Sequence, residues 1–277
     1  MARHSHGEVP MIDVQVRGRS DRGRVREANE DHYFIGVLRK LVEVQDTNLE
    51  VRDAVRELSK LDAYLLVVAD GVGGVAGGRR ASQSAIFSLA TFIGRTAACH
   101  YDPNVQQENE FLERLEHALQ HAHAVVRSLS TPGRGPATTL TMAMIIDRRA
   151  YIAHVGDSRA YVLSRGRLRQ ITQDQTMAAL LEDEGVDVRN APRLANTLAS
   201  AVGAQEMTPA IGLLDLTPGD VLLLCTDGLT KHVSDTEIAE MLASDPDPEP
   251  VCNRLVDAAL AGGGTDNVTV VVARADG

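Results

Sequence analysis

Four aspartates stand at the margins of apolar segments that are widely separated in the sequence. Asp70 follows YLLVVA, Asp157 follows YIAHVG, Asp227 follows DVLLLCT, and Asp266 precedes NVTVVV. An aspartate beside a strand usually forms a turn, so each one alone indicates little. Several carboxylates at converging strand ends would repel one another strongly, and bound cations are the main way to neutralise such a cluster.

The donor atoms in these segments indicate which cation could bind. They are mainly oxygens, the three cysteines lack the spacing of a zinc site, and no paired histidine lies nearby. Oxygen ligands favour Mg²⁺ or Mn²⁺ over Zn²⁺. A pair of such ions suits displacement at phosphorus, because the ions make water nucleophilic near neutral pH and stabilise the departing oxygen. Gly71, directly after Asp70, lets the backbone approach closely and offers a carbonyl as a further ligand.

The spacing of apolar residues predicts the elements that must position these groups. Strands are expected at 12–16, 33–38, 63–69, 139–146, 150–155, 160–163, 210–214, 221–225 and 268–273, and helices at 77–98, 108–129, 177–184, 235–243 and 251–261. The strands come mostly as hairpins, with helices between blocks of strands. This order favours an α+β fold in which helices cover antiparallel sheets.

Length and composition favour one domain over residues 1–277, with 44% hydrophobic residues to form a core. Two segments stand out: a charged insertion at about 39–62 and a weakly periodic, flap-like segment at about 173–208. The net charge of −10 argues against a nucleic-acid partner. No apolar run reaches membrane-spanning length, and the first residues lack the apolar core of a secretory signal, so no membrane partner and a cytoplasmic location are expected.

Six short motifs follow one another along the chain. They are Arg26 with Asn29-Glu30-Asp31, Asp70-Gly71-Val72-Gly73-Gly74, Thr138-Thr139, Gly156-Asp157-Ser158-Arg159, Thr226-Asp227-Gly228 and Gly264-Thr265-Asp266-Asn267. In this order they resemble the metal-dependent protein phosphatases of the type 2C serine/threonine class, particularly the compact bacterial members, over about residues 11–273. The resemblance implies a four-layer α-β-β-α sandwich of two antiparallel sheets flanked by helices.

The resemblance also implies a metal-binding role for five of the matching residues. Asp70 would bridge two Mn²⁺ or Mg²⁺ ions, Asp227 and Asp266 would complete the first position, and the Gly71 carbonyl would serve the second. Asp157, together with Asp227, would hold the third ion that is found in many bacterial relatives.

Four other matching residues would act beside the ions. Arg26 would bind the substrate phosphate, a role that suits a planar bidentate donor, and would form the catalytic set with Asp70 and Asp227. Glu30 would hold water at the ions, with support from Asp31, and Asn267 would stand behind the ligands.

The sequence thus predicts hydrolysis of phosphoserine and phosphothreonine esters in proteins by a metal-activated water, without a phosphoenzyme. From the resemblance we expect a signal-transduction enzyme whose partners are phosphorylated proteins, made by a serine/threonine kinase, and the kinase itself; a monomer is expected. Two alternatives stay open. One is a catalytically weak, phosphoprotein-binding regulator on the same fold, and the other is a different two-metal phosphoesterase such as a nuclease.

Overall fold

The computed structural model describes residues 12–39, 62–74, 77–96, 105–130, 135–188 and 191–276. One sheet has the spatial order β1 (Asp13–Asp21), β12 (Val268–Asp276), β11 (Val221–Cys225), β8 (Arg159–Ser164) and β9 (Arg167–Gln170). The second has the order β10 (Ala210–Asp215), β7 (Arg149–Val155), β6 (Leu140–Ile146), β3 (Asp62–Ala69) and β2 (His32–Arg39). A short ribbon pairs β4 (Gly71–Val72) with β5 (Ala137–Thr138). All the pairings are antiparallel.

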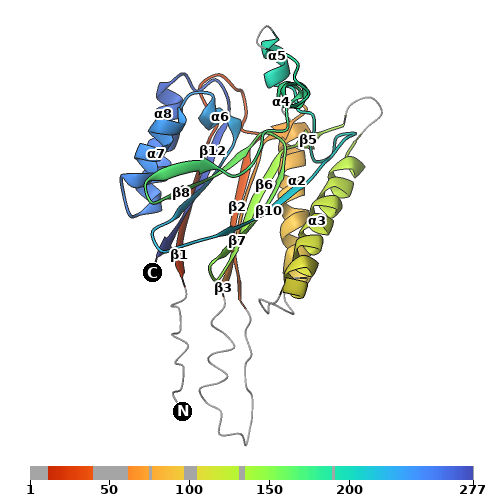
Figure 1. Cartoon of the computed structure of the whole chain (residues 1–277). Helices are drawn as coiled ribbons and strands as arrows, with labels where there is room; N and C mark the ends of the chain where they lie inside the picture. Colours follow the sequence, from red (N-terminus) through yellow and green to blue (C-terminus); the bar gives the residue numbers. More distant parts are fainter. Residues whose placement is uncertain are drawn as a thin grey trace, which may run out of the picture.

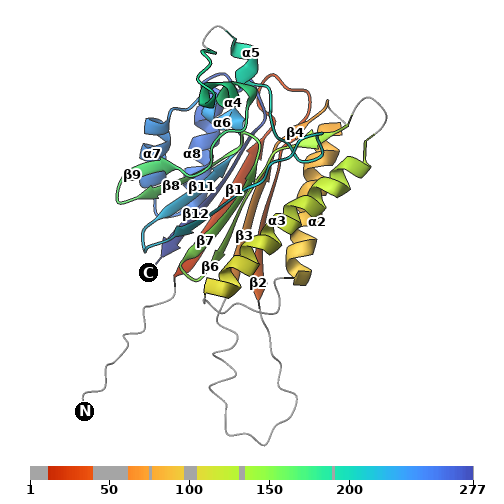
Figure 2. The ribbon, with the colours of Figure 1, turned by 45° about the vertical axis from the view of Figure 1, so that its right-hand side comes forward.

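Helices cover the outer faces of both sheets. The helices are α2 (Gly77–Thr96), α3 (Val105–Ser128), α4 (Met177–Asp183), α5 (Pro192–Ala195), α6 (Asp227–Thr230), α7 (Asp235–Ala243) and α8 (Pro248–Ala261). In Figure 1, α7 and α8 lie to the left of the sheets, and α2 and α3 lie to the right. Figure 2 shows the same order of layers from a second direction. The expected four-layer α-β-β-α sandwich is confirmed.

Three apolar layers hold the sandwich together. The layer between the sheets includes Leu66, Val68, Ile152, Leu222 and Val271. The layer under α2 and α3 includes Leu65, Val67, Leu89 and Leu119, and that under α7 and α8 includes Leu223, Ile238, Leu255 and Val272. Successive residues of a strand point to opposite faces, and both faces of β3 and β11 are covered. The central strands therefore form continuous apolar runs.

Strand direction brings the four aspartates to one end of the sandwich. β3 and β7 each pair antiparallel with β6, which lies between them, so they run the same way and their carboxyl ends lie at the same edge of the sheet. Asp70 and Asp157 follow these two ends. In the other sheet Cys225, the last residue of β11, pairs with Val270 near the start of β12, which places Asp227 and Asp266 on adjoining loops.

The charged insertion starts from the opposite end. Arg39 and Asp62 face each other as the outermost pair of β2 and β3 and form an ion pair with an Nη2–Oδ2 distance of 3.1 Å. The whole length of β3, eight residues, separates Asp62 from Asp70. Residues 40–61, which make up nearly all of this predicted insertion, lie outside the described residues.

The final long helix begins earlier than the sequence pattern predicts. Prolines at 246, 248 and 250 favour a loop with a helix from Val251, but α8 starts at Pro248. The side chain of Asp247 caps it by accepting a hydrogen bond from the Glu249 amide at 2.9 Å. A helix leaves its first amides without intrahelical partners, so proline, which has no N–H, is tolerated in the first turn.

The flap-like segment contains α4 and α5 and returns to the sandwich beside the aspartates. Thr176 pairs with Leu198 at the base of the segment, and Thr138 pairs with Val202. Figure 1 shows α4 and α5 at the top of the molecule, at the end opposite to the start of β1. Within the described residues no helix is long and apolar enough to cross a lipid bilayer.

The inter-sheet layer gives a stability prediction. Leu66 is fully buried between the sheets. Leu66→Ala should therefore lower the free energy of unfolding by about 2–5 kcal/mol through lost burial and the cavity left behind. Urea unfolding followed by circular dichroism measures this value.

The control for this prediction is Val37→Ala on the neighbouring β2. The Val37 residue is 42% exposed. Its truncation should cost less than about 1 kcal/mol, because little apolar surface is returned to water. Equal losses in the two variants would contradict the assigned core.

Candidate metal centre

One cavity of about 1050 Å³ collects nearly all the residues singled out from the sequence. Its lining includes Arg26, Glu30, Asp70, Gly71, Asp157, Asp227, Asp266 and Asn267. These residues come from both sheets and from loops as far apart in the chain as residues 26 and 267. Asp31 is the exception among the predicted residues, because it is 4% exposed and lies beneath the cavity rather than on its wall.

Two threonines fix the backbone of Asp70, and a serine contacts one of them. The Asp70 amide donates to Thr139 Oγ1 at 2.9 Å, and the Thr139 amide donates back to the Asp70 carbonyl at 2.9 Å. The Thr138 hydroxyl donates to the same carbonyl at 2.7 Å. Thr139 Oγ1 also lies 2.7 Å from Ser158 Oγ, next to Asp157. These hydrogen bonds satisfy the backbone amide and carbonyl of Asp70 without using its carboxylate. The residue lines the cavity, and its carboxylate is not needed to hold the backbone.

Close backbone contact joins the loops that carry Asp227 and Asp266. A Cβ atom on Gly228 would lie 1.9 Å from the Asn267 carbonyl oxygen. Only glycine, which has no side chain, permits this approach. The Thr226 amide donates to the Thr269 carbonyl at 3.0 Å, which extends the β11–β12 pairing to the loop. The spacing of the two carboxylates is therefore set by main chain rather than by flexible side chains.

Asn267 orders the loop that carries Arg26 and Glu30. Its side-chain carbonyl accepts from the Glu30 amide at 2.8 Å, and its side-chain amide donates to the carbonyls of Arg22 at 2.7 Å and Ala28 at 3.0 Å. One side chain thus meets three backbone groups of a loop that is distant in the sequence. Asn267 positions its neighbours, and its own polar atoms are used in doing so.

A second tight approach places Glu30 beside the Gly71 carbonyl. A Cβ on Gly78 would lie 2.6 Å from the Gly71 oxygen and 2.7 Å from Glu30 Oε1. The start of α2 therefore packs against both groups only because residue 78 has no side chain. Burial raises the pKa of the Glu30 carboxyl, although the nearby Arg26 charge works against this.

Asp31 links the two sheets from below. Its Oδ2 accepts hydrogen bonds from the hydroxyls of Thr226 and Thr269, both at 2.8 Å. Burial raises the pKa of Asp31 to about 7; the two hydroxyls oppose this shift, and the Asp227 carboxylate adds to it. Asp31 supports the strand ends beside Asp227 and Asp266 but does not itself line the cavity.

The positive charges near these carboxylates do not fully offset their burial and their mutual repulsion. Burial raises the pKa of Asp70 well above its ordinary value, and the charges of Asp31 and Asp227 raise it further. Burial raises the pKa of Asp157 to about 7, with added repulsion from Asp227. The pKa of Asp227 is also raised by burial, although Lys231 partly offsets the effect. Repulsion of this kind is what a divalent cation relieves.

Two basic side chains already contact the cluster. Arg26 binds Asp266 through both oxygens, with Nε–Oδ1 at 2.7 Å and Nη2–Oδ2 at 2.8 Å. Lys231 Nζ lies 2.5 Å from Asp227 Oδ2 and 2.7 Å from Asp266 Oδ2. Burial disfavours ionised Asp266, but the hydrogen bonds from Arg26 and Lys231 prevail and lower its pKa. The Arg26 side chain is still 52% exposed at the mouth of the cavity.

The oxygen atoms of the centre fit a hard divalent cation. Asp227 Oδ1 and Glu30 Oε1 are buried with no hydrogen-bond partner, an expensive state unless a cation satisfies them. Within the described part of the chain, however, no three His, Cys, Asp or Glu side chains are oriented as a finished metal-binding set. In this structure Lys231 instead contacts one oxygen each of Asp227 and Asp266, and Arg26 pairs with Asp266.

Lys231 and His232 line the cavity wall but were not predicted from the sequence. Residues 196–201 and 204–206 of the flap-like segment also line the wall. Lys231 stands four residues after Asp227, which puts the two side chains on one face of a helical turn, but α6 is too short to give a periodic signal. The flap-like segment has no motif, and its bridges at Thr138 and Thr176 bring it to the cavity.

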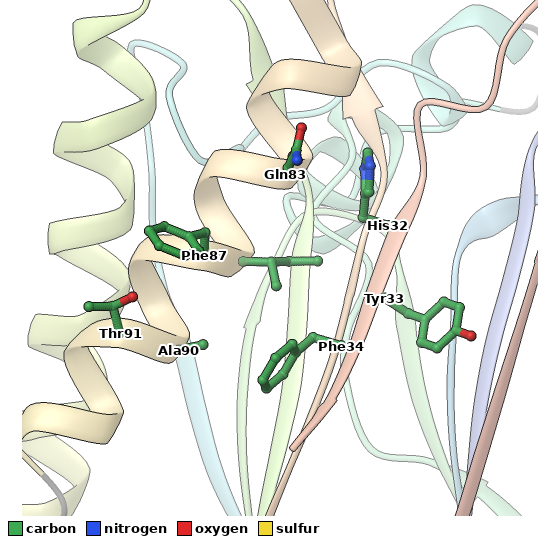
Figure 3. A pocket seen from close by; sticks show the side chains of 8 residues that line it. His32, Tyr33, Phe34, Gln83, Phe87, Ala90 and Thr91 are labelled. Atoms are coloured by element: carbon green, nitrogen blue, oxygen red, sulfur yellow. The ribbon is translucent and has the colours of Figure 1, made fainter.

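A second cavity, of about 440 Å³, lies between β2 and α2 (Figure 3). Its lining is mainly apolar and aromatic, with Phe34, Ile86, Phe87 and Ala90 beside His32. Figure 3 shows Phe34 on the side of β2 that faces α2 and Tyr33 on the other side. This lining has no carboxylate, so the chemistry expected from the sequence belongs to the larger cavity.

Comparison with known proteins agrees with this geometry. The family model described as protein phosphatase 2C matches residues 44–262. The serine/threonine phosphatase stp of Listeria monocytogenes serotype 4b is 30% identical over 263 residues, which cover 93% of this chain and 94% of that protein. The serine/threonine protein phosphatase PstP of Mycobacterium tuberculosis (H37Rv) is 35% identical over 269 residues. That match covers 94% of this chain but 45% of PstP, so the chain spans less than half of that relative.

Solved structures show the same fold. The crystal structure of the Mycobacterium tuberculosis phosphatase PstP/Ppp superposes with a TM-score of 0.76 at 32% identity, over 96% of this chain and 100% of that one. The catalytic domain of PstP in complex with two manganese ions gives a TM-score of 0.74 at 33% identity, over 97% and 100%. The family match, the relatives and the fold agree, and the chain belongs to the protein phosphatase 2C family.

Proposed function

We propose that this protein hydrolyses phosphoserine and phosphothreonine esters in proteins at a centre of two Mn²⁺ or Mg²⁺ ions. The observation that carries the proposal is the meeting of Asp70, Asp227 and Asp266, from three distant parts of the chain, in one cavity. The relatives support it, since those named above are serine/threonine phosphatases and the PstP catalytic domain binds two manganese ions.

The ligand set that we propose follows from which oxygens reach the cavity. Asp70 would serve both ions, with Asp227 and Asp266 at the first and the Gly71 carbonyl at the second. Asp157 lines the same cavity and would take part in holding a third ion. When bound, the ions would make water nucleophilic near neutral pH and neutralise charge on the departing oxygen.

The remaining chemistry would fall to side chains of the chain itself. Arg26, held at Asp266 and half exposed, would bind the phosphate dianion and orient it. Glu30 would order water near the ions, and Asn267 would order the loop that carries Arg26 and Glu30. Asp31 would hold the neighbouring strands in place. A water oxygen would form the new bond to phosphorus as the ester bond breaks, giving the free hydroxyl side chain and inorganic phosphate.

A covalent enzyme intermediate is not part of the proposal. None of the described residues that line the cavity is a cysteine. Cys225 and Cys252 are buried elsewhere, and burial raises the pKa of each thiol to about 12. A thiol with such a pKa is a poor nucleophile at neutral pH, because the thiolate is the reactive form.

The two alternatives predict different outcomes in one assay. Incubation with Mn²⁺ and a phosphothreonine peptide should release phosphate, and the same incubation with a nucleic acid should leave the polymer intact. A nuclease would give the reverse result. A regulator that only binds phosphoproteins would retain the peptide without releasing phosphate.

Asp227→Ala tests the centre directly. Loss of this carboxylate should lower kcat/KM on the phosphothreonine peptide by about 10³-fold or more, since transition-state charge stabilisation is removed. Asp215→Ala is the matched control, because Asp215 is exposed at the end of β10 and does not line the cavity. Circular dichroism should show both variants folded. Cation-dependent turnover retained in Asp227→Ala would refute the assignment.

The buried carboxyl of Asp31 gives a pH prediction for protein kept in a chelator. Its pKa of about 7 exceeds the ~3.9 of an unfolded chain, so between these values the folded protein binds more protons than the unfolded chain. This contribution is full at low pH and is lost as pH rises through 7. The unfolding free energy of Asp31→Asn, minus that of the wild type, should therefore rise by at least about 1.4 kcal/mol from pH 4 to 8.

Urea unfolding at pH 4, 5, 6, 7 and 8 measures this difference. The difference between the two proteins is needed because burial lowers the pKa of His154 to about 4, which gives both proteins an opposite slope. Saturating Mn²⁺ should flatten the pH dependence of the difference, since the cations neutralise the carboxylates around Asp31. A difference that does not change with pH in chelator would contradict the prediction.

We also propose that the segment 173–208 acts as a flap that contacts the protein part of the substrate. Gln205 lies on the cavity wall. Gln205→Ala should raise KM for a phosphoprotein about threefold to tenfold, while the rate on a small aryl phosphate changes less than about twofold. Glu182→Ala, in the same segment but outside the lining, is the control. Parallel losses on both substrates in Gln205→Ala would show that the residue serves the centre itself.

The other expectations stay predictions. Substrates made by a serine/threonine kinase and action on the kinase itself are proposals from the sequence resemblance. A monomeric state and a cytoplasmic location are also proposals. The interpretation of residues 1–277 as one domain with a charged insertion at 39–62 is also a prediction from the sequence.

A further inference from the structure

Lys231 holds an unusual position for a cation in this centre. Its ammonium nitrogen lies between two carboxylates, 2.5 Å from Asp227 Oδ2 and 2.7 Å from Asp266 Oδ2. These carboxylates come from the end of β11 and the start of β12. The ammonium thus takes one oxygen from each of the two aspartates that we propose as ligands of the same metal ion.

The residue is also distinctive in the sequence. The chain has three lysines among its 28 basic residues, and Lys231 is the one within the described residues. On the other side of Asp266 the guanidinium of Arg26 binds both carboxylate oxygens. Two positive groups therefore meet at Asp266 Oδ2, and of the two, Lys231 also reaches Asp227.

We propose that Lys231 is a built-in competitor for the divalent cation at Asp227 and Asp266. Its ammonium neutralises the two carboxylates when no ion is bound there, and it must withdraw before an ion can bind them. The strength of this competition sets the cation affinity of the centre. The inference rests on the proposed function, because it takes these aspartates as metal ligands.

The geometry allows the ammonium to leave without disturbing the ligands. The backbone amide of Lys231 donates to the Asp227 carbonyl at 2.9 Å, so the end of α6 stays fixed while the side chain moves. The side chain is 30% exposed and lines the cavity. A lysine has a flexible four-carbon stem and a compact, strongly hydrated charge, so its head can turn into solvent at little cost.

Arg26 differs from Lys231 in this respect. Its planar fork binds Asp266 at two points, and that pairing leaves Asp227 free. A cation could approach Asp227 and the unshared face of Asp266 with Arg26 in place. The ammonium, by contrast, lies between the two carboxylates, where it would repel a divalent ion at close range.

The decisive variant is Lys231→Met, which keeps an apolar stem and removes the charge. Isothermal titration of chelator-treated protein with MnCl₂ should give a Kd for Mn²⁺ that is lower by at least about tenfold, which corresponds to about 1.4 kcal/mol. The same variant, held in chelator, should melt at a lower temperature than the wild type, because two carboxylates lose their counter-charge. Arg254→Gln is the control, since Arg254 lies on α8 and its loss removes an equal charge from a surface ion pair with Asp245.

A second measurement uses the wild-type protein and does not depend on how the variant folds. Reductive methylation followed by mass spectrometry should modify Lys231 slowly in chelator and at least about threefold faster in saturating Mn²⁺. The reason is that in chelator the amine lies between two carboxylates that shield it from the reagent, whereas it turns toward solvent once Mn²⁺ binds them. Lys40 and Lys60 provide the internal reference for reagent activity.

The possible outcomes separate this inference from the proposed function. An Mn²⁺ affinity in Lys231→Met that is unchanged or weaker, or a methylation rate of Lys231 that does not respond to Mn²⁺, overturns the competitor role. If the wild type still binds Mn²⁺ and releases phosphate in that case, the proposed function stands. A wild type that binds no Mn²⁺ overturns both.

Discussion

Repulsion among buried carboxylates is the constraint to which the rest of this structure responds. Asp31, Asp70, Asp157 and Asp227 lie close enough together for their pKa values to be raised, and burial is the largest cause in each case. A fold gains nothing from such a cluster by itself, since unpaired buried charge is costly. The surroundings must therefore hold the groups in place and offer them positive charge.

Backbone contacts do most to hold these aspartates in place. Asp70 is fixed through its amide and carbonyl by Thr138 and Thr139, so its side chain is not used for structure. Gly228 allows the β11 and β12 loops to touch, which fixes the distance between Asp227 and Asp266. Ligands carried by strand ends and locked main chain are positioned more accurately than ligands on long loops. The burial of the apolar layer between the sheets stabilises the fold and offsets the cost of their repulsion.

The sequence was enough to predict the fold and most of the acidic residues that line the cavity, because both depend on patterns that repeat or recur in order. Apolar strands that end in aspartate indicated the converging acids, and hairpin order indicated the antiparallel sheets. The sequence does not predict features that depend on a single contact. Asp31 and Asn267 were expected behind the ligands, but only coordinates show that Asp31 accepts from Thr226 and Thr269 or that Asn267 meets three backbone groups. The early start of α8 depended on one cap, Asp247.

Lys231 is the cavity residue whose position is least evident from the sequence. In the sequence it is one charged residue after the short segment Asp227–Thr230, and it carries no motif. In the fold, the four-residue turn of α6 directs it back toward Asp227, and the β11–β12 pairing brings Asp266 to the same place. A centre that must exchange a bound cation benefits from a counter-charge that is attached to the chain but weakly confined. Arginine in a two-point pairing would lock the carboxylates, whereas a lysine on a flexible stem neutralises them and can still withdraw.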